Sequence, residues 1–556
     1  MEELTEALRL PPALCAVLAV RGFGVVDDAK RFLRPLVDHL HDPADLADGE
    51  VAARRIARAV RAGERILVHG DYDVDGICAT ALFTRFLRNV GADVVPFVPH
   101  RLRDGYDFGD AGLKTAQEAG AKLIVTADCG TVAAEPIGRA MAAGLDVVVT
   151  DHHTVGPDPS PASALVNPQR PDCAYPEKGL CGTGLVFKVA ELVSRELGVG
   201  TEELHGLLDL VALATVADLV PLQGENRVLV RHGLTRFARS RVVGLNALLS
   251  VARVDPATIH AGQLGFVVAP RINAVGRMGD SADALRLLLT EDHAEAEALA
   301  RRLDDTNRVR QDEDRRTLDE ALELLARDFD PDRDFGVVLA SEGWHPGVIG
   351  IVASRVVERI HRPTVLIALE GEQGRGSARS VPGFHLYDAL SACRGHMGRF
   401  GGHRQAAGMD VARDSVAALR KAFNEEASRR LSPEDLRPVL RPDGEVALRE
   451  IDLELVHWLG YLGPHGIGNA RPLFLARGVQ IEGARRLKDV HLKASLRDGG
   501  ATLDAIGFGL AVSHPPESLH AGFFDVLVKL ERNEWRGVAR PQAQILDLRP
   551  SGSGLP

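Results

Sequence analysis

The chain has 556 residues, of which 45% are hydrophobic and 26% are charged, and its formal net charge is −11. This length allows several domains with sizeable cores, and this composition is typical of a globular protein rather than a disordered or fibrous one. The negative charge excludes a general attraction for nucleic acid, so any such binding must come from a local basic patch or from metal ions.

Cysteine usage and hydropathy bear on the location of the protein. The six cysteines form no Cys-x-x-Cys pair, which argues against a structural zinc site, and their scatter suits a reducing cytosol. The N-terminal segment lacks the basic start of a signal peptide, and no apolar run approaches the ~20 residues that span a bilayer. We therefore expect a cytoplasmic protein with no membrane association.

The first part of the chain reads as an α/β domain. Residues 1–50 have the pattern of short helices, which we expect to pack on the domain that follows. Apolar strand patterns then alternate with helical ones, and this alternation is typical of a parallel sheet covered by helices. The expected strands are residues 65–68, 94–98, 123–126 and 147–150, and the expected helices are 51–62, 77–91, 111–119 and 132–143.

Polar side chains gather where these strands end. His69, Asp71, Asp73 and Asp75 follow the first strand, Asp128 follows the third, and Asp151-His152-His153 follows the fourth. The carboxyl ends of parallel strands meet at one edge of a sheet, so these side chains should converge. Crowded carboxylates are most easily kept ionised by a divalent cation, and oxygen and imidazole ligands suit Mn²⁺ or Mg²⁺. The alternative is that single aspartates only cap the helices that follow them.

A helical region covers residues 182–240 and carries one further carboxylate. Asp218 lies in the nearly apolar helix predicted for residues 207–219. A buried carboxylate needs a partner, which can be a metal ion, a buried arginine or a helix end.

The middle of the chain marks a domain boundary. Residues 270–278, which carry Arg271 and Arg277 among small residues, read as a loop that could hold phosphate or face solvent. Residues 282–329 read as one long, highly charged helix, of the kind that bridges domains with both faces partly solvated.

A second α/β unit begins near residue 336. A strand over 336–340, a helix over 348–360 and a strand over 364–369 are followed by two glycine-rich, basic segments that read as turns. The segments are residues 374–380, with Ser377 and Arg379, and residues 401–408, with His403. Glycines let backbone amides approach an anion and arginine binds phosphate through two bonds, so these turns could hold phosphate.

The last part has the pattern of a small all-β barrel. Short β-like runs at 480–481, 490–496, 502–508 and 524–530 are split by turns. Such a module fits an OB-like fold that binds single strands, although a purely structural barrel is an alternative. The expected organisation is a helical segment (1–50), a parallel-sheet catalytic domain (51–280), a long connecting helix (281–330), a smaller α/β substrate-binding domain (331–435) and the OB-like domain (436–556).

Taken together, these motifs resemble those of the DHH phosphoesterase superfamily. The segments His69–Gly76, Asp128-Cys129-Gly130, Asp151-His152-His153 and Ala217-Asp218 resemble its four motifs in order, and residues 401–408 resemble the DHH-associated domain that usually follows. Length, the long helix and the final β domain are similar to those of the bacterial single-strand-specific 5′→3′ DNA exonucleases of this superfamily.

The resemblance implies roles for individual residues. Two Mn²⁺ or Mg²⁺ ions would be held by His69, Asp73, Asp75, Asp128, His152 and Asp218, with His153 close to the metals or the scissile phosphate. Arg101, Arg271, Ser377, Arg379 and His403 would hold the substrate, with Ser377 and Arg379 at a terminal 5′-phosphate. The implied activity is release of 5′-mononucleotides from the 5′ end of single-stranded DNA in recombination and repair. Single-strand-binding protein and a helicase are the implied partners.

Two other functions remain open at this stage. One is an oligoribonuclease or cyclic-dinucleotide phosphodiesterase of the same superfamily, although these usually lack the N-terminal portion and the β domain. The other is a non-catalytic single-strand-binding protein, which would be expected to have lost the metal ligands that this sequence retains.

Overall fold

The computed structural model of the chain describes residues 2–101, 103–520 and 522–552. Two compact units emerge: the first combines Met1–Pro99, Asp104–Ala269 and Arg441–Pro556, and the second combines His100–Arg103 and Pro270–Leu440. Within the described ranges, no helix is both long and apolar enough to cross a membrane.

The first unit contains the predicted parallel sheet. Its five strands run in the order β2-β1-β3-β4-β5, all pairs being parallel, which confirms the predicted parallel sheet and adds a short fifth strand. The order reverses between β1 and β3, which is where open α/β sheets bind ligands. The strands are β1 (Ile66–Gly70), β2 (Val94–Phe97), β3 (Leu123–Ala127), β4 (Asp146–Thr150) and β5 (Ala164–Val166).

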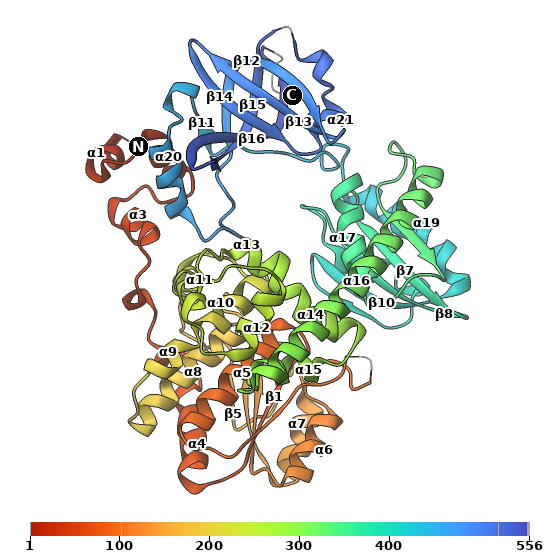
Figure 1. Cartoon of the computed structure of the whole chain (residues 1–556). Helices are drawn as coiled ribbons and strands as arrows, with labels where there is room; N and C mark the ends of the chain where they lie inside the picture. The colour runs from red at the N-terminus through yellow and green to blue at the C-terminus, as the bar shows by residue number, and fades with distance from the viewer. Residues whose placement is uncertain (1, 102, 521, 553–556) are drawn as a thin grey trace. The chain divides into compact units, whose positions relative to one another are not determined.

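Helices cover both faces of this sheet (Figure 1). On one face Leu67 and Ile124 pack against Leu113 and Ile137 in a buried cluster. These strand residues alternate with others that face the opposite helices, as the period of two in a strand requires. The helices are α4 (Gly49–Ala62) and α5 (Val74–Asn89) on one face, and α6 (Asp110–Ala119) and α7 (Ala134–Ala142) on the other.

A mostly helical segment follows the sheet, as expected. It consists of α8 (Gly182–Leu197), α9 (Glu202–Gly206), α10 (Leu208–Ala217), α11 (Gly224–Arg236), α12 (Val243–Val251), α13 (Ala261–Gln263) and α14 (Ala269–Met278). The prediction of a loop over 270–278 is therefore wrong, because Ile272, Ala274 and Val275 are buried at helical spacing. A wide π-helical turn over Leu264–Val268 precedes Pro270 and makes room for a ring that an ordinary helix would exclude.

The predicted single helix over 282–329 is also wrong in detail. The structure has two helices, α15 (Ser281–Leu289) and α16 (His293–Asp328), separated by residues 290–292. The Asp292 side chain accepts a hydrogen bond from the backbone N–H of Glu295 at 2.9 Å and caps α16. An N-cap of this kind marks the start of a new helix, although the charged sequence pattern alone predicted one continuous helix.

The second unit contains a mixed five-stranded sheet in the order β6-β7-β8-β10-β9. The glycine-rich residues 374–380 are not a turn: most of them form β8, which pairs antiparallel with both β7 and β10. Glycines are required there, because a Cβ on Gly374 or Gly376 would lie 2.7 Å from Ile367 or Met409 respectively. The elements are β6 (Val337–Ser341), α17 (Ile349–Ile360), β7 (Thr364–Glu370), β8 (Gln373–Arg379), α18 (Leu386–Ala392), β9 (Phe400–Gly402), β10 (Ala406–Ala412) and α19 (Val416–Arg430).

The C-terminal part of the first unit is the predicted barrel. Strand pairings run β12-β13-β14-β16-β15, and β15 pairs back to β12, which closes five strands. Strand β16 was not predicted, and β12 is much longer than the run at 480–481. The elements are β11 (Gly444–Glu445), α20 (Leu453–Leu459), β12 (Phe474–Leu487), β13 (His491–Asp498), β14 (Ala501–Gly507), α21 (Leu510–Ser513), β15 (Phe524–Trp535) and β16 (Val538–Pro550).

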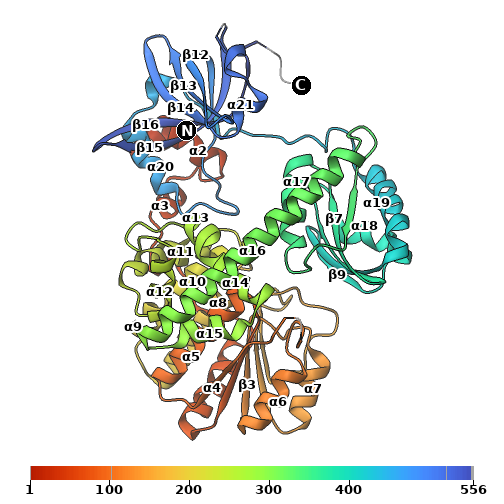
Figure 2. The same ribbon diagram turned by 45° about the vertical axis from the view of Figure 1, so that its right-hand side comes forward.

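The N-terminal helices share the core of this barrel. Leu14 and Leu18 are buried in one cluster with barrel residues such as Phe474 and Val526. Figure 2 shows α2 next to the strands of the barrel. The expectation that residues 1–50 pack on the domain that follows is therefore wrong for these helices, although Phe32 also contacts Arg227 of α11. The helices are α1 (Glu2–Leu8), α2 (Pro12–Val20) and α3 (Val26–Leu33).

Candidate metal centre and anion cavity

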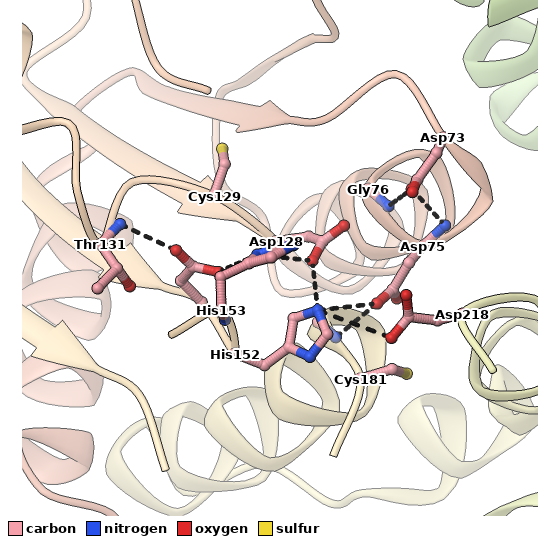
Figure 3. Close-up of polar contacts among 12 residues, drawn as sticks. Asp73, Asp75, Gly76, Asp128, Cys129, Thr131, His152, His153, Cys181 and Asp218 are labelled. Carbon is pink, nitrogen blue, oxygen red and sulfur yellow. Dashed lines mark hydrogen bonds and ion pairs between the residues drawn. The ribbon is translucent and has the colours of Figure 1, made fainter. Parts of the chain in front are cut away.

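Four polar side chains from distant parts of the first unit meet at the carboxyl edge of its sheet. Asp75 lies in the first turn of α5, Asp128 directly follows β3, His152 follows β4, and Asp218 caps the C-terminus of α10. The Nε2 atom of His152 lies 3.0 Å from Oδ1 of Asp128, 3.7 Å from Oδ2 of Asp218 and 3.8 Å from Oδ2 of Asp75 (Figure 3). The convergence expected from the strand ends is therefore present for Asp75, Asp128 and His152, and Asp218 joins them from the end of a helix.

Asp128 is aimed by an unusual backbone conformation. Its φ is 71°, in the left-handed region that non-glycine residues rarely adopt. Its backbone N–H still donates to the carbonyl of Thr150 at 2.9 Å, which extends the pairing of β3 with β4 by one residue. The sheet thus holds the backbone while the sharp turn directs the carboxylate away from the strand.

Asp75 is anchored by the N-terminus of α8. Oδ2 accepts the backbone N–H of Gly182 at 2.6 Å, and Oδ1 accepts the backbone N–H of Thr183 at 2.7 Å and its hydroxyl at 2.6 Å. Free N–H groups at a helix N-terminus stabilise a negative charge. The contact of Gly182 and Thr183 with the site was not predicted, since the sequence indicated only that a helical region begins at residue 182.

The electrostatics of this cluster indicate a place for cations. Burial raises the pKa of Asp128 well above its usual range, and the neighbouring charges of Asp75 and Asp73 add to the rise. Burial and the same two neighbours raise the pKa of Asp218 to about 9. These carboxyl groups cannot all ionise at neutral pH without a compensating positive charge.

The donor atoms themselves fit a hard divalent ion. Asp128 Oδ1 and His152 Nε2 are buried and have no hydrogen-bond partner among the described atoms. In the part of the chain that the structure describes, two groups of three side chains could hold a metal ion, namely Asp128, His152 and His153, and Asp75, His152 and Asp218. Carboxylate and imidazole donors suit Mn²⁺ or Mg²⁺.

His153 is held beside the cluster by a set of polar contacts. Its Nδ1 lies 2.8 Å from Asp151 Oδ1, and its Nε2 lies 3.2 Å from the Tyr106 hydroxyl. The other Asp151 oxygen accepts the backbone N–H of Thr131 at 2.9 Å. Burial alone would lower the pKa of His153, but the hydrogen bond and charge of Asp151 raise it to about 9. Asp151 was expected among the side chains that converge at this edge but was given no role of its own, and Tyr106 was not predicted as a site residue.

Two predicted metal ligands lie outside both groups of three. The His69 ring packs against Phe97 and Phe108, its Nδ1 lies 3.6 Å from Cys129 Sγ, and burial lowers its pKa to about 4. Asp73 caps α5, since its Oδ1 accepts the backbone N–H groups of Asp75 at 2.9 Å and of Gly76 at 3.1 Å. The cap considered in the sequence analysis is therefore present at Asp73.

The predicted substrate-binding residues lie in the second unit, and three of them line one cavity there. The cavity has a volume of about 530 Å³, and Arg101, Ser377 and Arg379 contribute to its wall. Arg271 and His403 are not among its lining residues. Instead, Arg271 donates to Asp304 at 2.9 Å, and His403 is exposed in the turn between β9 and β10.

The inner end of this cavity is built for an anion. A Cβ on Gly350, in the first turn of α17, would lie 2.9 Å from both Ser377 Oγ and Arg379 Nη2. A helix N-terminus, a hydroxyl and a guanidinium therefore face the same space, a combination that suits phosphate. The arginines 277, 375 and 399 also line the cavity and were not predicted as site residues. Arg375 could have been predicted, because residues 375, 377 and 379 alternate along the chain and therefore share one face of a strand.

A pH-dependent stability is expected for the metal-free protein. Asp218 and His153 both have folded-state pKa values raised to about 9, so each stabilises the fold at low pH and loses that contribution as the pH rises. In the presence of chelator, the melting temperature should therefore fall between pH 7 and 9, by about 2–4 °C for each kcal/mol lost. Saturating Mg²⁺ should abolish this fall.

The matched control for this measurement is Asp218→Asn. This change removes the carboxyl group and should flatten the pH dependence of the melting temperature in chelator. A chelated wild-type protein that melts at the same temperature at pH 7 and 9, with or without Mg²⁺, would contradict the electrostatic description of the cluster.

Comparisons with known proteins agree with this architecture. Three family models match: the DHH family N-terminal domain over residues 65–215, the DHHA1 domain over 334–429 and the RecJ OB domain over 442–547. The chain is 36% identical to the single-stranded-DNA-specific exonuclease RecJ of Bacillus subtilis, covering 98% of this chain and 69% of that protein. It is 34% identical to the protein of the same name from Escherichia coli, covering 97% and 96%.

Solved structures of related proteins contain metal ions. RecJ from Thermus thermophilus in complex with Mn²⁺ matches with a TM-score of 0.84 at 33% identity, covering 99% of this chain and 78% of that one. The complex of the same protein with Mg²⁺ matches with a TM-score of 0.78 at 32% identity, covering 99% and 77%. The ions in those structures are the two that the donor set of this centre suits.

Proposed function

Because the chain belongs to the RecJ family of single-stranded-DNA-specific exonucleases, we propose that it degrades single-stranded DNA from the 5′ end and releases 5′-mononucleotides. It is a metal-dependent enzyme that uses Mn²⁺ or Mg²⁺, and two ions are proposed. The observation that carries the proposal is that the side chains of Asp75, Asp128, His152 and Asp218 converge. Two atoms of this cluster, Asp128 Oδ1 and His152 Nε2, are buried and make no hydrogen bond among the described atoms.

The proposed ligand set extends beyond these four residues. The two groups of three side chains share His152 Nε2, and one imidazole nitrogen binds only one ion. Carboxylate oxygens must therefore complete the second metal site. Asp73 uses Oδ1 as a helix cap, which leaves Oδ2 for a cation. His69 stays in the set because burial keeps it neutral, the form that binds a metal ion.

The residues of the chain divide the work of phosphodiester hydrolysis. When bound, the cations supply Lewis-acid activation of a water and neutralise charge on the scissile phosphate. His153, kept protonated by Asp151, offers a positive charge and a proton beside the cluster. The carboxylates of Asp75 and Asp128 are fixed before substrate arrives, by α8 and by the turn after β3, so little reorganisation is needed during reaction.

Polarity is proposed to come from the anion cavity of the second unit. Ser377, Arg379 and the start of α17 would seat the terminal 5′-phosphate, which a 3′ end lacks. The OB domain would hold the following strand, as such domains commonly do. Arg271 and His403 are retained as weaker candidates for contacts with the strand. A role in recombination and repair, with single-strand-binding protein and a helicase as partners in the cytoplasm, is proposed on the same basis.

The test compares three substrates under saturating Mn²⁺ or Mg²⁺. A long 5′-phosphorylated single strand should be degraded rapidly to 5′-mononucleotides, with label at the 5′ end released first. A blunt duplex of the same sequence and a dinucleotide should be poor substrates. Cleavage of dinucleotides with long strands left intact, or release of label from the 3′ end first, would overturn the proposal.

A further inference from the structure

The anion cavity of the second unit is larger than its proposed ligand. Its volume is about 530 Å³. Cavities of roughly 300–1,000 Å³ hold ligands of drug size, and a terminal phosphate is far smaller than such a ligand. The cavity therefore has room for more than the phosphate at the end of a strand.

The floor of the cavity is an open stretch of sheet. Side chains on β8 alternate, so Arg375, Ser377 and Arg379 share the face that lines the cavity, while Gly374 and Ala378 face the core. On the neighbouring strands Gly408 lies opposite Ser377, and Gly401 lies opposite Gly408. A Cβ on Gly401 would meet nothing within 4 Å, and one on Gly408 would meet only a backbone oxygen at 3.9 Å. The floor is thus bare beside Ser377.

Positive charge extends along this floor beyond the inner end. Among the described residues that line the cavity are five arginines and one carboxylate, Asp410. Asp410 pairs with Arg399 at 3.3 Å and lies opposite Arg375 across the two strands. Arg379 donates to the Ala378 carbonyl and to Ser377 Oγ, and both burial and the charge of Arg101 lower its pKa. Arg375 and Arg399 therefore lie beside a single carboxylate, which leaves a net positive charge on the floor next to the site of the terminal phosphate.

We propose that this cavity holds a 5′-triphosphate, so that the enzyme also accepts single strands with a 5′-triphosphate end. This inference rests on the proposed function. Ser377, Arg379 and the start of α17 hold the phosphate next to the 5′ carbon. Arg375, the next residue on the same face of β8 and about 7 Å from Ser377 along the strand, holds the outer phosphates together with Arg399.

The first turnover on such a strand has a distinctive product. One water is consumed: its oxygen bonds to the phosphorus that links the first two nucleotides, the bond from that phosphorus to the 3′-oxygen of the first nucleotide breaks, and this 3′-oxygen takes a proton. The products are one nucleoside 5′-triphosphate and a strand shortened by one residue that ends in a 5′-monophosphate. Every later turnover releases a 5′-mononucleotide, so each strand gives one nucleoside triphosphate.

The test uses the full chain with Mg²⁺ and matched DNA strands that carry a 5′-hydroxyl, a 5′-monophosphate or a 5′-triphosphate. Chromatography should detect one nucleoside triphosphate per 5′-triphosphate strand. Arg375→Ala should lower kcat/KM for the 5′-triphosphate strand relative to the 5′-monophosphate strand about tenfold, which corresponds to one lost charged contact of about 1.4 kcal/mol. Arg359→Ala, at an exposed arginine of α17 that does not line the cavity, is the control and should leave this ratio unchanged.

A binding measurement separates this inference from the proposed function. In chelator, inorganic triphosphate should bind the wild-type protein more tightly than orthophosphate, and Arg375→Ala should remove the difference. Competitive inhibition of 5′-monophosphate strands by a free nucleoside triphosphate would extend the ligand from strand ends to free nucleotides. If no strand is cleaved, the proposed function fails, but this binding measurement in chelator still tests the inference.

Two results would overturn the inference. The first is inorganic triphosphate that binds no more tightly than orthophosphate. The second is Arg375→Ala slowing all three strands equally, because this would mean that the outer arginines hold the strand backbone instead of the 5′ end.

Discussion

Replacing Asp128 by alanine is expected to reduce strand cleavage by about 10³-fold or more. Loss of a residue that only supports a metal ligand typically costs 10–100-fold, and Asp128 is itself a proposed ligand at the centre of the cluster. Its Oδ1 lies 3.0 Å from His152 Nε2 and makes no hydrogen bond among the described atoms. Steady-state degradation of a 5′-labelled single strand measures the effect.

Stability and binding distinguish this loss from unfolding. Burial and neighbouring carboxylates raise the pKa of Asp128, so its removal relieves repulsion in the metal-free protein. The variant should melt at the same temperature as the wild type in chelator or higher, and it should still bind single strands. Near-normal cleavage by a folded Asp128→Ala protein would show that the catalytic centre lies elsewhere.

Replacing Gly182 by alanine is expected to lower kcat/KM by about 100-fold, although Gly182 carries no chemistry. The added Cβ would lie 2.5 Å from Cβ and 2.6 Å from Oδ1 of Asp128. Asp128 or the start of α8 must therefore move, and the start of α8 also holds Asp75. A misplacement of about 1 Å in a catalytic constellation can cost 10²-fold in rate. The affinity for Mn²⁺, measured by calorimetry, should fall in parallel.

Gly184→Ala provides the matched control two residues further along α8. There an added Cβ would make only ordinary contacts, at 3.6 Å from Leu180 and 3.7 Å from Cys181. Alanine is preferred to glycine inside a helix by roughly 0.5–1 kcal/mol, so this variant should be as stable and as active as the wild type. Equal activity of the two glycine variants would mean that the fit of Gly182 against Asp128 is unimportant.

Local patterns were sufficient for the sheet and for most of its donors. The strands at 65–68, 94–98, 123–126 and 147–150 were recognised from short apolar runs, and Asp128 and His152 were recognised from their place after strands. These residues converge because parallel strands end at the same edge of the sheet. A position directly after a strand therefore predicts which side chains lie close together. The predicted ligand His69 follows the same rule, yet its ring packs against Phe97 and Phe108.

Local patterns failed where a tertiary contact outweighs them. The arginines among small residues in 270–278 suggested a loop, but a π-helical turn before Pro270 lets the helix continue. The glycines of 374–380 suggested a turn, but they form a central strand because neighbouring side chains fill the space over them. The N-terminal segment was correctly predicted to form short helices, but their packing partner is a barrel more than 400 residues away.

The sequence by itself determined the fold class, the edge of the sheet at which the site lies and the donor types, because period and strand ends are local properties. Only the tertiary structure decided how the donors are held. The start of α8 anchors Asp75 from 107 residues away, and Asp151 orients His153. Only the tertiary structure likewise revealed the arginine-lined cavity, because its lining residues come from β8, β10 and α17 and share no periodic sequence pattern. Contacts of this kind depend on which elements pack together, and a linear pattern does not record that.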